Sequence, residues 1–305
     1  MTQLILHHHD PSPFAEKIRL VFGLKSLRWQ SVQIPMVMPK PDLTELTGGY
    51  RKTPVLQVGA DVYCDTSLIA MELENRFPDP SLFPAGHAGI SRALGRWSDQ
   101  AFFEPGAGLS MGENKAIPEA VMNDRKDFFN FLDFDRMDEE IPHAYAQFQA
   151  QCQLLEEELA GSDTRFIMGE QASWVDIQAY FPLWMANSNI PRAAELLAPF
   201  PAIRDWSAQM ESIGRGDRSE LDSKAALQIA ADAEPIPDTG VKSSPFHDFS
   251  RGDPVSVAPD DYGAVPVQGA LVQLDFSKIV IARESPSLGQ TAVHFPRAGY
   301  RVGRV

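Results

Sequence analysis

The sequence has 305 residues, which exceeds one average domain, so we expect two or three structural modules. Its 44% hydrophobic and 22% charged residues are typical of a globular protein and exclude a chain that is disordered or collagen-like throughout. The net charge of -14 repels phosphate backbones and anionic lipids, so we expect neither a nucleic-acid nor a membrane partner.

The cysteine content and the start of the sequence indicate the cellular compartment. Cys64 and Cys152 are too few for a disulfide framework, as expected in a reducing environment. The first residues contain no basic leader with an apolar segment, and no later run approaches the ~20 apolar residues of a membrane span. We therefore expect a soluble cytoplasmic protein.

The first 80 residues alternate between strand and helix patterns. Residues 4–6 form a short apolar run, and apolar residues then recur at helical spacing from Phe14 to Phe22. Ser12 and Pro13 occupy the N-cap and first helical positions of that helix. Further along, the sequence predicts a strand over 29–34, an irregular loop over 35–41, a hairpin over 55–58 and 62–64, and a helix over 69–77.

From about residue 88 the pattern is helical. A long helix is predicted around 144–159, and the segment 173–176 has the Ser-x-x-Asp spacing of a capping box that begins another helix. The acidic, Phe-rich stretch 124–140 is typical of a solvated helix with one buried face, and the alternative is a segment that contributes to a dimer contact. A weakly amphipathic helix over 219–233 should end before Pro235, and residues 235–245 resemble a linker.

The last 60 residues have a different character. Short β-branched runs lie at 255–257, 271–274, 279–281 and 293–295, separated by Gly, Pro and Asp. We expect a small, mostly β extension over residues 246–305, packed on the helical domain or on a partner subunit.

Several short segments are unspecific singly, but their order and spacing are informative. They are Ser12-Pro13-Phe14-Ala15, Lys17-Ile18-Arg19, Lys52-Thr53-Pro54-Val55-Leu56, Asp65-Thr66 with Leu68-Ile69, and Met168-Gly169-Glu170 with Ser173-Trp174-Val175-Asp176. Together they resemble the glutathione S-transferase family over residues 4 to about 210. The resemblance implies a thioredoxin-like, glutathione-binding domain over 1–84 and an all-α domain over 88–234. The extension 246–305 has no counterpart in the family pattern.

The resemblance also implies roles for individual residues. Ser12 falls where the family keeps its thiol-activating residue, so its hydroxyl would bind the glutathione sulfur and lower the thiol pKa. The segment of Thr53, Pro54 and Val55 matches the cis-proline and the main chain that pairs with the cysteinyl part. The remaining glutathione-binding candidates are Asp65 and Thr66 for the γ-glutamyl end, and Lys40 and Lys52 for the glycyl carboxylate.

Each of these signals also has a structural interpretation. Taken alone, Ser12 is a helix N-cap, Pro54 an ordinary edge proline, and Asp65-Thr66 a helix cap. The sequence departs from the family in two places, because Asp65-Thr66 replaces Glu-Ser and Gly48-Gly49 replaces Asn-Pro.

The leading hypothesis is a glutathione transferase that conjugates electrophiles or reduces peroxides, with glutathione as co-substrate, a small-molecule second substrate and a homodimeric assembly. Serine at position 12 favours this chemistry over thiol transfer, because serine cannot form a mixed disulfide. The alternative is a non-catalytic glutathione-binding or scaffold protein that uses its extension for partner contacts. A reductase acting through Cys64 is the weakest hypothesis, since a buried, inert thiol is the default there.

Two further groups of residues have competing interpretations. His7, His8 and His9 alternate faces along a strand, so we expect loop-lining histidines and no metal site, with His9 the best placed to border the thiol. The aromatic and apolar residues Trp97, Phe102, Phe103, Met111 and those of 128–134 form either a wall for the second substrate or, more commonly at helical spacing, part of the core.

Overall fold

The computed structural model describes residues 3–305, which form two compact units. The first unit contains residues 3–15, 28–72 and 217–305, and the second contains residues 16–27 and 73–216. The division into 1–84, 88–234 and 246–305 stays a prediction, but the contacts group the end of the chain with its beginning.

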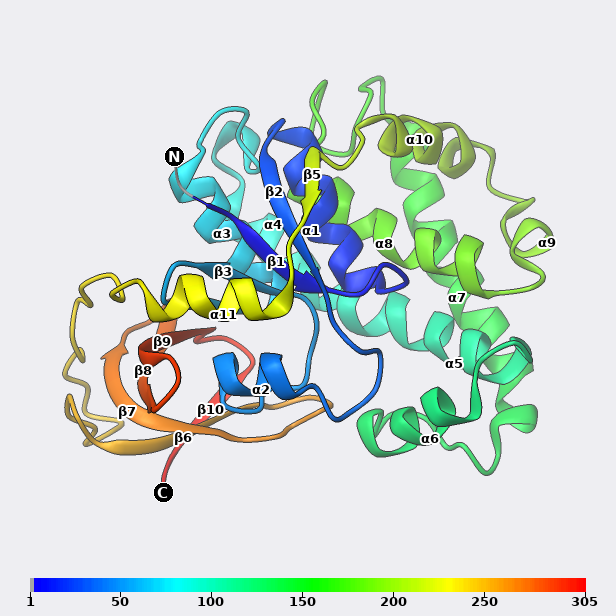
Figure 1. The fold of residues 1–305 in the computed structure, drawn as a ribbon. Helices are drawn as coiled ribbons and strands as arrows, with labels where there is room; N and C mark the ends of the chain where they lie inside the picture. The colour runs from blue at the N-terminus through cyan, green and yellow to red at the C-terminus, as the bar shows by residue number, and fades with distance from the viewer. Residues whose placement is uncertain (1–2) are drawn as a thin grey trace. The chain divides into compact units, whose positions relative to one another are not determined.

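A ten-stranded sheet is the framework of the first unit, with the strand order β10-β6-β7-β8-β9-β4-β3-β1-β2-β5 (Figure 1). Its strands are β1 (Ile5–His8), β2 (Arg28–Gln33), β3 (Val55–Val58), β4 (Asp61–Cys64), β5 (Asp217–Glu220), β6 (Pro254–Pro259), β7 (Val267–Leu274), β8 (Lys278–Ser285), β9 (Gly289–Pro296) and β10 (Tyr300–Arg304). The predicted hairpin is β3 and β4, and the predicted strand over 29–34 is β2. The sequence analysis did not predict β5 or β10.

The C-terminal extension continues this sheet. Strand β9 runs parallel to β4, with Asp61 opposite Ala292. His294 of β9 makes a 2.7 Å contact from Nε2 to Oδ1 of Asp61 and stacks on Tyr63 at 4.4 Å between ring centroids. The sequence analysis did not predict this attachment to the N-terminal strands, and packing on the helical domain or on a partner subunit stays a prediction. The attachment forms because β4 leaves a row of backbone donors and acceptors, which β9 satisfies.

The extension and the N-terminal strands share one hydrophobic core. Val62 and Cys64 of β4 belong to the same buried cluster as Val257, Ile281 and Phe295 of the extension. A cluster that includes both segments makes the extension an integral part of the first unit rather than an attached module.

Two short helices pack on the sheet within the first unit. Helix α11 (Ser223–Ala231) buries Ala226 against Ile5 and Val32, and the side chain of Asp222 caps its N-terminus. Of the helix predicted over 219–233, the structure forms only α11. The earlier residues 217–220 are a strand that pairs with β2. Helix α2 (Pro41–Thr47) was not predicted. Helices α1 (Pro13–Leu24) and α3 (Thr66–Arg76) match the expected helices and lead from the first unit into the second.

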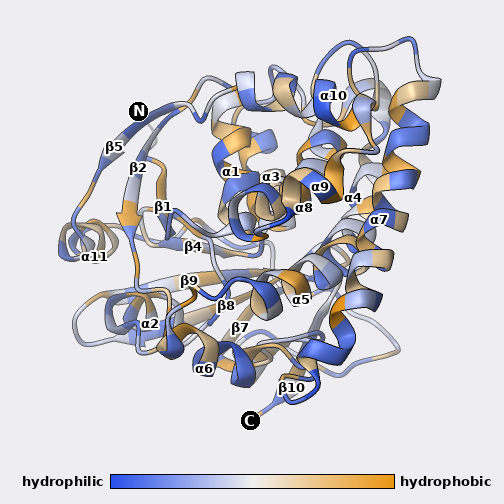
Figure 2. Ribbon diagram, turned by 90° about the vertical axis from the view of Figure 1, so that its right-hand side faces the viewer, coloured by the Kyte–Doolittle hydropathy of each residue, from blue (hydrophilic) through white to orange (hydrophobic). Residues whose placement is uncertain are grey.

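The second unit is helical over most of its length. Its elements are η1 (Pro84–Gly86), α4 (Ala88–Arg96), the π-helical η2 (Trp97–Phe102), α5 (Phe103–Glu113), α6 (Glu119–Phe128), α7 (Met137–Gly161), α8 (Trp174–Asn189), α9 (Ala193–Leu197) and α10 (Pro201–Ser212). Helix α7 buries Phe148, Cys152 and Leu155 and alternates between hydrophobic and hydrophilic residues (Figure 2). Within residues 3–305, none of the helices has the length and apolarity needed to cross a membrane.

Two predictions for this unit have different outcomes. The capping box is confirmed, because Oδ2 of Asp176 accepts hydrogen bonds from the backbone N–H and the hydroxyl of Ser173, at 2.9 and 2.7 Å. The single solvated helix over 124–140 was wrong, since α6 ends at Phe128 and α7 begins at Met137. Phe129, which is buried, follows α6 with an extended backbone, so the helical hydrogen bonding stops there.

Candidate functional site

Three of the predicted ligand-binding segments leave the same end of the sheet. Strand β3 is antiparallel to both β1 and β4, with Val55 opposite His7 on one side and Cys64 on the other. The end of β1, the start of β3 and the end of β4 therefore lie together. Ser12, Pro54 and Asp65 follow or precede these strand ends within a few residues, so the first unit gathers them in one region.

Ser12 is the N-cap of α1 and is nearly buried, with 4% of its surface exposed. Its Oγ accepts a hydrogen bond from the N–H of Ala15 at 3.2 Å. A serine hydroxyl has one proton and two lone pairs, so accepting this bond leaves the proton available for donation to a ligand. The cap interpretation and the functional interpretation of Ser12 are thus compatible.

The peptide bond between Thr53 and Pro54 is cis, as the resemblance implied. Val55 follows as the first residue of β3 and is fully buried. Lys40, which is also buried, donates from Nζ to Oγ1 of Thr53 at 3.4 Å. These contacts place Lys40, one of the two candidate lysines, beside the proline segment.

Asp65 adopts a left-handed backbone conformation with φ of 79° directly before α3. Its Oδ1 accepts hydrogen bonds from the backbone N–H and the hydroxyl of Ser67, at 2.9 and 2.7 Å. Its Oδ2 accepts a bond from the hydroxyl of Tyr300 at 3.2 Å. Thr66, the first residue of α3, is 5% exposed. The carboxylate of Asp65 is therefore held in one orientation by donors on both oxygens.

Tyr300 comes from β10 and belongs to a buried pair of phenols. Its hydroxyl lies 2.8 Å from that of Tyr50, and the ring of Phe295 packs against both tyrosine rings. Burial raises the pKa of both tyrosines well above 10, so both stay protonated. The single hydroxyl proton of Tyr300 is donated to Asp65. The hydroxyl of Tyr50 therefore donates to that of Tyr300, so the hydrogen bonds run from Tyr50 through Tyr300 to Asp65.

Lys52 is also held by the extension. Its Nζ lies 2.5 Å from Oδ1 of Asp261 and 4.2 Å from the ring centroid of Tyr262. Sequence reasoning missed Asp261, Tyr262 and Tyr300 as neighbours of the candidate site. No local motif marks these residues, and only the unexplained extension itself pointed toward an additional role.

The first residue of the Gly48-Gly49 departure lies against the extension. Gly48 ends α2 with φ of 80°, a conformation that favours glycine. A Cβ there would lie 2.4 Å from Nε of Arg283. Arg283 of β8 donates from Nη1 to the carbonyl oxygen of Glu45 at 3.0 Å, so a cation satisfies the C-terminal end of α2.

The histidines of β1 and the two cysteines are buried in the protein. His7 and His8 lie in β1 rather than in a loop, and they contact Gln57 and Ser31 through Nε2 at 2.8 and 3.1 Å. Burial lowers the pKa of His7 to about 4. Among the residues that the structure describes, no group of three or more His, Cys, Asp or Glu side chains is placed to hold a metal ion. Burial raises the pKa of the thiols of Cys64 and Cys152, which disfavours thiolate chemistry at either one.

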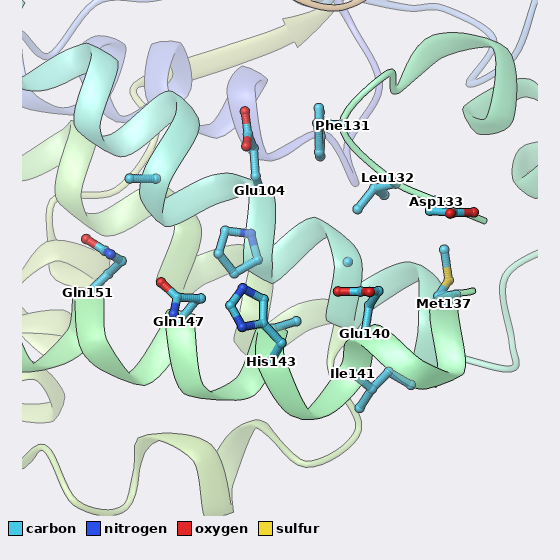
Figure 3. Close-up of a pocket in the computed structure, with 14 residues that line it drawn as sticks. Glu104, Phe131, Leu132, Asp133, Met137, Glu140, Ile141, His143, Gln147 and Gln151 are labelled. Carbon is cyan, nitrogen blue, oxygen red and sulfur yellow. The ribbon is translucent and has the colours of Figure 1, made fainter. Parts of the chain in front are cut away.

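The second unit contains a cavity of about 410 Å³ between α5 and α7 (Figure 3). Its lining includes the apolar residues Phe131, Leu132, Met137 and Ile141 and the acidic residues Glu104, Asp133 and Glu140. Of the aromatic residues that could form a wall for the second substrate, Phe131 lines this cavity. Phe102 and Phe103 are instead buried, against Phe148 and Phe181 respectively, so for these two the core interpretation is correct.

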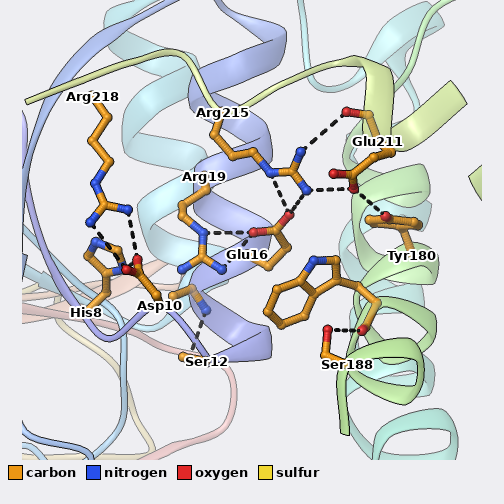
Figure 4. A network of polar contacts seen from close by, with 12 residues as sticks. His8, Asp10, Ser12, Glu16, Arg19, Tyr180, Ser188, Glu211, Arg215 and Arg218 are labelled. Atoms are coloured by element: carbon orange, nitrogen blue, oxygen red, sulfur yellow. Dashed lines mark hydrogen bonds and ion pairs between the residues drawn. The ribbon is translucent and has the colours of Figure 1, made fainter. Parts of the chain in front are cut away.

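The charged residues of the segment 17–19 lie inside the second unit. Lys17 is fully buried, pairs with Asp99, and has its Nζ 4.4 Å from the ring centroid of Phe181. Glu16 accepts bonds from Arg19 at 2.8 Å and from Arg215 at 2.6 Å (Figure 4). These pairs compensate buried charge, so the basic residues of this segment support the fold.

Comparison with known proteins agrees with this architecture. Residues 6–81 match the family model of the glutathione S-transferase N-terminal domain, and residues 138–209 match that of the C-terminal domain. A GST-like protein from Pseudomonas syringae has 35% sequence identity, with 100% of both chains covered and a TM-score of 0.79. No curated protein matches the chain significantly.

Two more distant structures share the fold. A glutathione S-transferase from Rhodospirillum rubrum F11 has 20% identity and a TM-score of 0.54, covering 69% of this chain and 88% of its own. FzlA from C. crescentus has 22% identity and a TM-score of 0.53 with the same coverage.

The class of protein is thus defined by a thioredoxin-like domain followed by a helical domain. The chain belongs to the glutathione S-transferase family, with additional C-terminal strands, and the full-length match shows that the Pseudomonas syringae protein is similar over this extension as well.

Proposed function

We propose that this chain binds glutathione and activates its thiol for attack on an electrophilic or peroxide substrate. One observation carries the proposal: the sheet brings Ser12, the cis-proline segment and Asp65 to one end of the first unit. The ligand would lie with its sulfur at Ser12, its cysteinyl main chain along Val55, and its γ-glutamyl group at Asp65 and Thr66.

In this proposal Ser12 stabilises the thiolate and does not itself form a bond to the substrate. The glutathione thiol releases its proton to solvent, and the Ser12 hydroxyl then donates a hydrogen bond to the negative sulfur. The N-terminus of α1 contributes the positive end of its dipole at the same place. In conjugation the sulfur forms a bond to an electrophilic carbon while the leaving group departs with its bonding electrons. In peroxide reduction the sulfur attacks one oxygen, the O–O bond breaks, the alkoxide takes a proton from solvent, and a second glutathione converts the sulfenic acid to the disulfide and water.

Substitution Ser12→Ala tests the role of the hydroxyl. A hydrogen bond to a charged group contributes about 1.5–3 kcal/mol, so the pKa of the bound thiol should rise by about 1–2 units while glutathione still binds. Ultraviolet titration of the thiolate gives the pKa, and isothermal titration calorimetry gives the affinity. Ser12→Thr is the matched control, since it keeps both the helix cap and a hydroxyl. An unchanged thiol pKa in Ser12→Ala would exclude activation by Ser12.

A second candidate function is glutathione binding without transferase chemistry. The observation that favours it is that Lys52 and Asp65, both assigned to the ligand, are contacted by residues of the extension, which has no counterpart in the family pattern. This candidate predicts that glutathione binds with an ordinary thiol pKa and that model electrophiles and peroxides are not consumed. The same titrations therefore distinguish the two candidates.

We also propose a homodimer in the cytoplasm. Family members are commonly dimeric, and the two free cysteines are buried, which suits a reducing compartment. Light scattering coupled to size-exclusion chromatography tests the assembly, and a mass equal to one chain would contradict it.

A further inference from the structure

The C-terminal extension contacts both ends of the proposed ligand site. Tyr300 donates to the carboxylate assigned to the γ-glutamyl end, and Asp261 pairs with a lysine assigned to the glycyl end. These two residues are distant in the sequence but come from paired strands of the extension, since Asp261 follows β6, and Tyr300 of β10 lies opposite Pro259 of β6. All four residues belong to the first unit.

At the γ-glutamyl end the extension orients a carboxylate. Tyr300 and Ser67 donate to different oxygens of Asp65, and Tyr50 fixes the direction in which Tyr300 donates. A carboxylate oxygen has two lone pairs, so Asp65 keeps acceptor capacity for an ammonium group. A fixed carboxylate binds an ammonium better than a mobile one, because less side-chain entropy is lost on binding.

At the glycyl end the extension places the carboxylate of Asp261 beside the positive charge of Lys52. Lys52 and Asp261 have side chains that are 15% and 33% exposed, so water screens their attraction only in part. A ligand carboxylate that approaches Lys52 must displace or tolerate the carboxylate of Asp261. Lys40 is the other candidate cation, and its Nζ is already engaged with Thr53.

We propose that the extension sets the ligand selectivity of this site, with Tyr300 as a positioning residue for Asp65 and Asp261 as a residue that opposes binding of a terminal carboxylate at Lys52. This inference rests on the proposed function. The substrate class that fits is a γ-glutamyl thiol with a free amino group whose opposite end is uncharged, such as a glycyl ester or amide of glutathione.

The test compares glutathione with its glycyl ethyl ester by isothermal titration calorimetry on the full chain. The wild type should bind the two within about threefold. Asp261→Asn should bind glutathione about three- to tenfold more tightly and the ester unchanged, because the partly screened cation of Lys52 then attracts the glycyl carboxylate without a competing carboxylate beside it. Asp260→Asn is the matched control, since it removes a neighbouring exposed carboxylate and should change neither affinity.

Tyr300→Phe tests the other end. It should weaken both glutathione and its ester by about three- to tenfold, less than the loss of a direct hydrogen bond to the ligand, because Tyr300 acts only by orienting Asp65. N-acetylglutathione, which lacks the free amino group, should lose no affinity, a result that a purely structural defect would not give. Tyr63→Phe, a buried tyrosine of β4, is the control and should leave all three affinities unchanged.

The outcomes separate the two proposals. If no thiol binds the wild type, the proposed function fails and this inference fails with it. If glutathione binds but Asp261→Asn leaves the preference between acid and ester unchanged, or Tyr300→Phe weakens N-acetylglutathione as strongly as glutathione, the inference alone is overturned.

Discussion

The sheet of the first unit gains strands on both sides of its N-terminal core, and the two sides are built differently. On one side β5 pairs with β2, and all four of its side chains are exposed. It is held by backbone hydrogen bonds and by ion pairs such as Arg218 with Asp10, 2.8 Å apart (Figure 4). On the other side β9 pairs with β4 and joins a large apolar core.

The difference shows that strand addition alone does not make a segment integral to a fold. Backbone pairing is common to both sides, but only the β9 side removes a large apolar surface from water. We therefore expect the extension to unfold together with the N-terminal strands, whereas β5 adds little stability. The following three predictions test this contrast, from the largest effect to the smallest.

The largest effect is expected at Phe295 of β9, which is fully buried between Tyr50 and Tyr300. Phe295→Ala should lower the free energy of unfolding by about 3–5 kcal/mol, because it leaves a cavity in the shared core. Chemical denaturation followed by circular dichroism measures this loss. Phe276→Ala, at a position that is 91% exposed, is the control and should have almost no effect. A small loss for Phe295→Ala would mean that the extension is an independent module.

An intermediate effect is expected in the central strand β1, through His7. Its pKa is about 4 in the folded state because of burial, against an ordinary value of 6.5 in the unfolded state. As the pH falls from 6.5 toward 4, the unfolded state gains a proton that the folded state does not, so stability is lost. The loss over this window should total roughly 3 kcal/mol.

The measurement is the free energy of unfolding at several pH values for the wild type and for His7→Gln. The difference between the two proteins isolates His7 from carboxylates that titrate at lower pH. The variant should have a shallower dependence between pH 4 and pH 6.5. Parallel curves would show that His7 is not the group responsible.

The smallest effect is expected on the β5 side. Arg218→Ala removes ion pairs with Asp10 and Glu220, whose side chains are 55% and 63% exposed. The free energy of unfolding should fall by less than about 1 kcal/mol, and the difference from the wild type should shrink in high salt. A loss comparable to that of Phe295→Ala would remove the contrast between the two sides.

The sequence predicted those elements whose signals are local. The helix that begins at Pro13, the hairpin of β3 and β4, and the capping box at Ser173 each follow from neighbouring residues. Strand β5 has the sequence Asp-Arg-Ser-Glu and no apolar alternation, so nothing local distinguishes it from a loop or a helix start. Its conformation depends on pairing with β2.

The candidate site likewise contains residues that local motifs predict and residues that they do not. Ser12, Pro54 and Asp65 could be proposed from short motifs, and they stay proposals as ligand contacts. The contacts of Asp261 and Tyr300 could not be predicted, because they join residues separated by most of the chain. A single sequence specifies such contacts only through the whole fold. The glycine at position 48 illustrates this, since its requirement partly comes from Arg283.

The pairing of Asp61 with Ala292 has a consequence for synthesis on the ribosome. Strand β4 is made before the residues of the helical unit that follow it, but its partner β9 is made after them. The residues of the helical unit, 16–27 and 73–216, are all available before β9 exists. We therefore expect the nascent chain to expose the edge of β4 and its apolar side chains until β9 has been made, which makes this edge the natural target for chaperones during biogenesis.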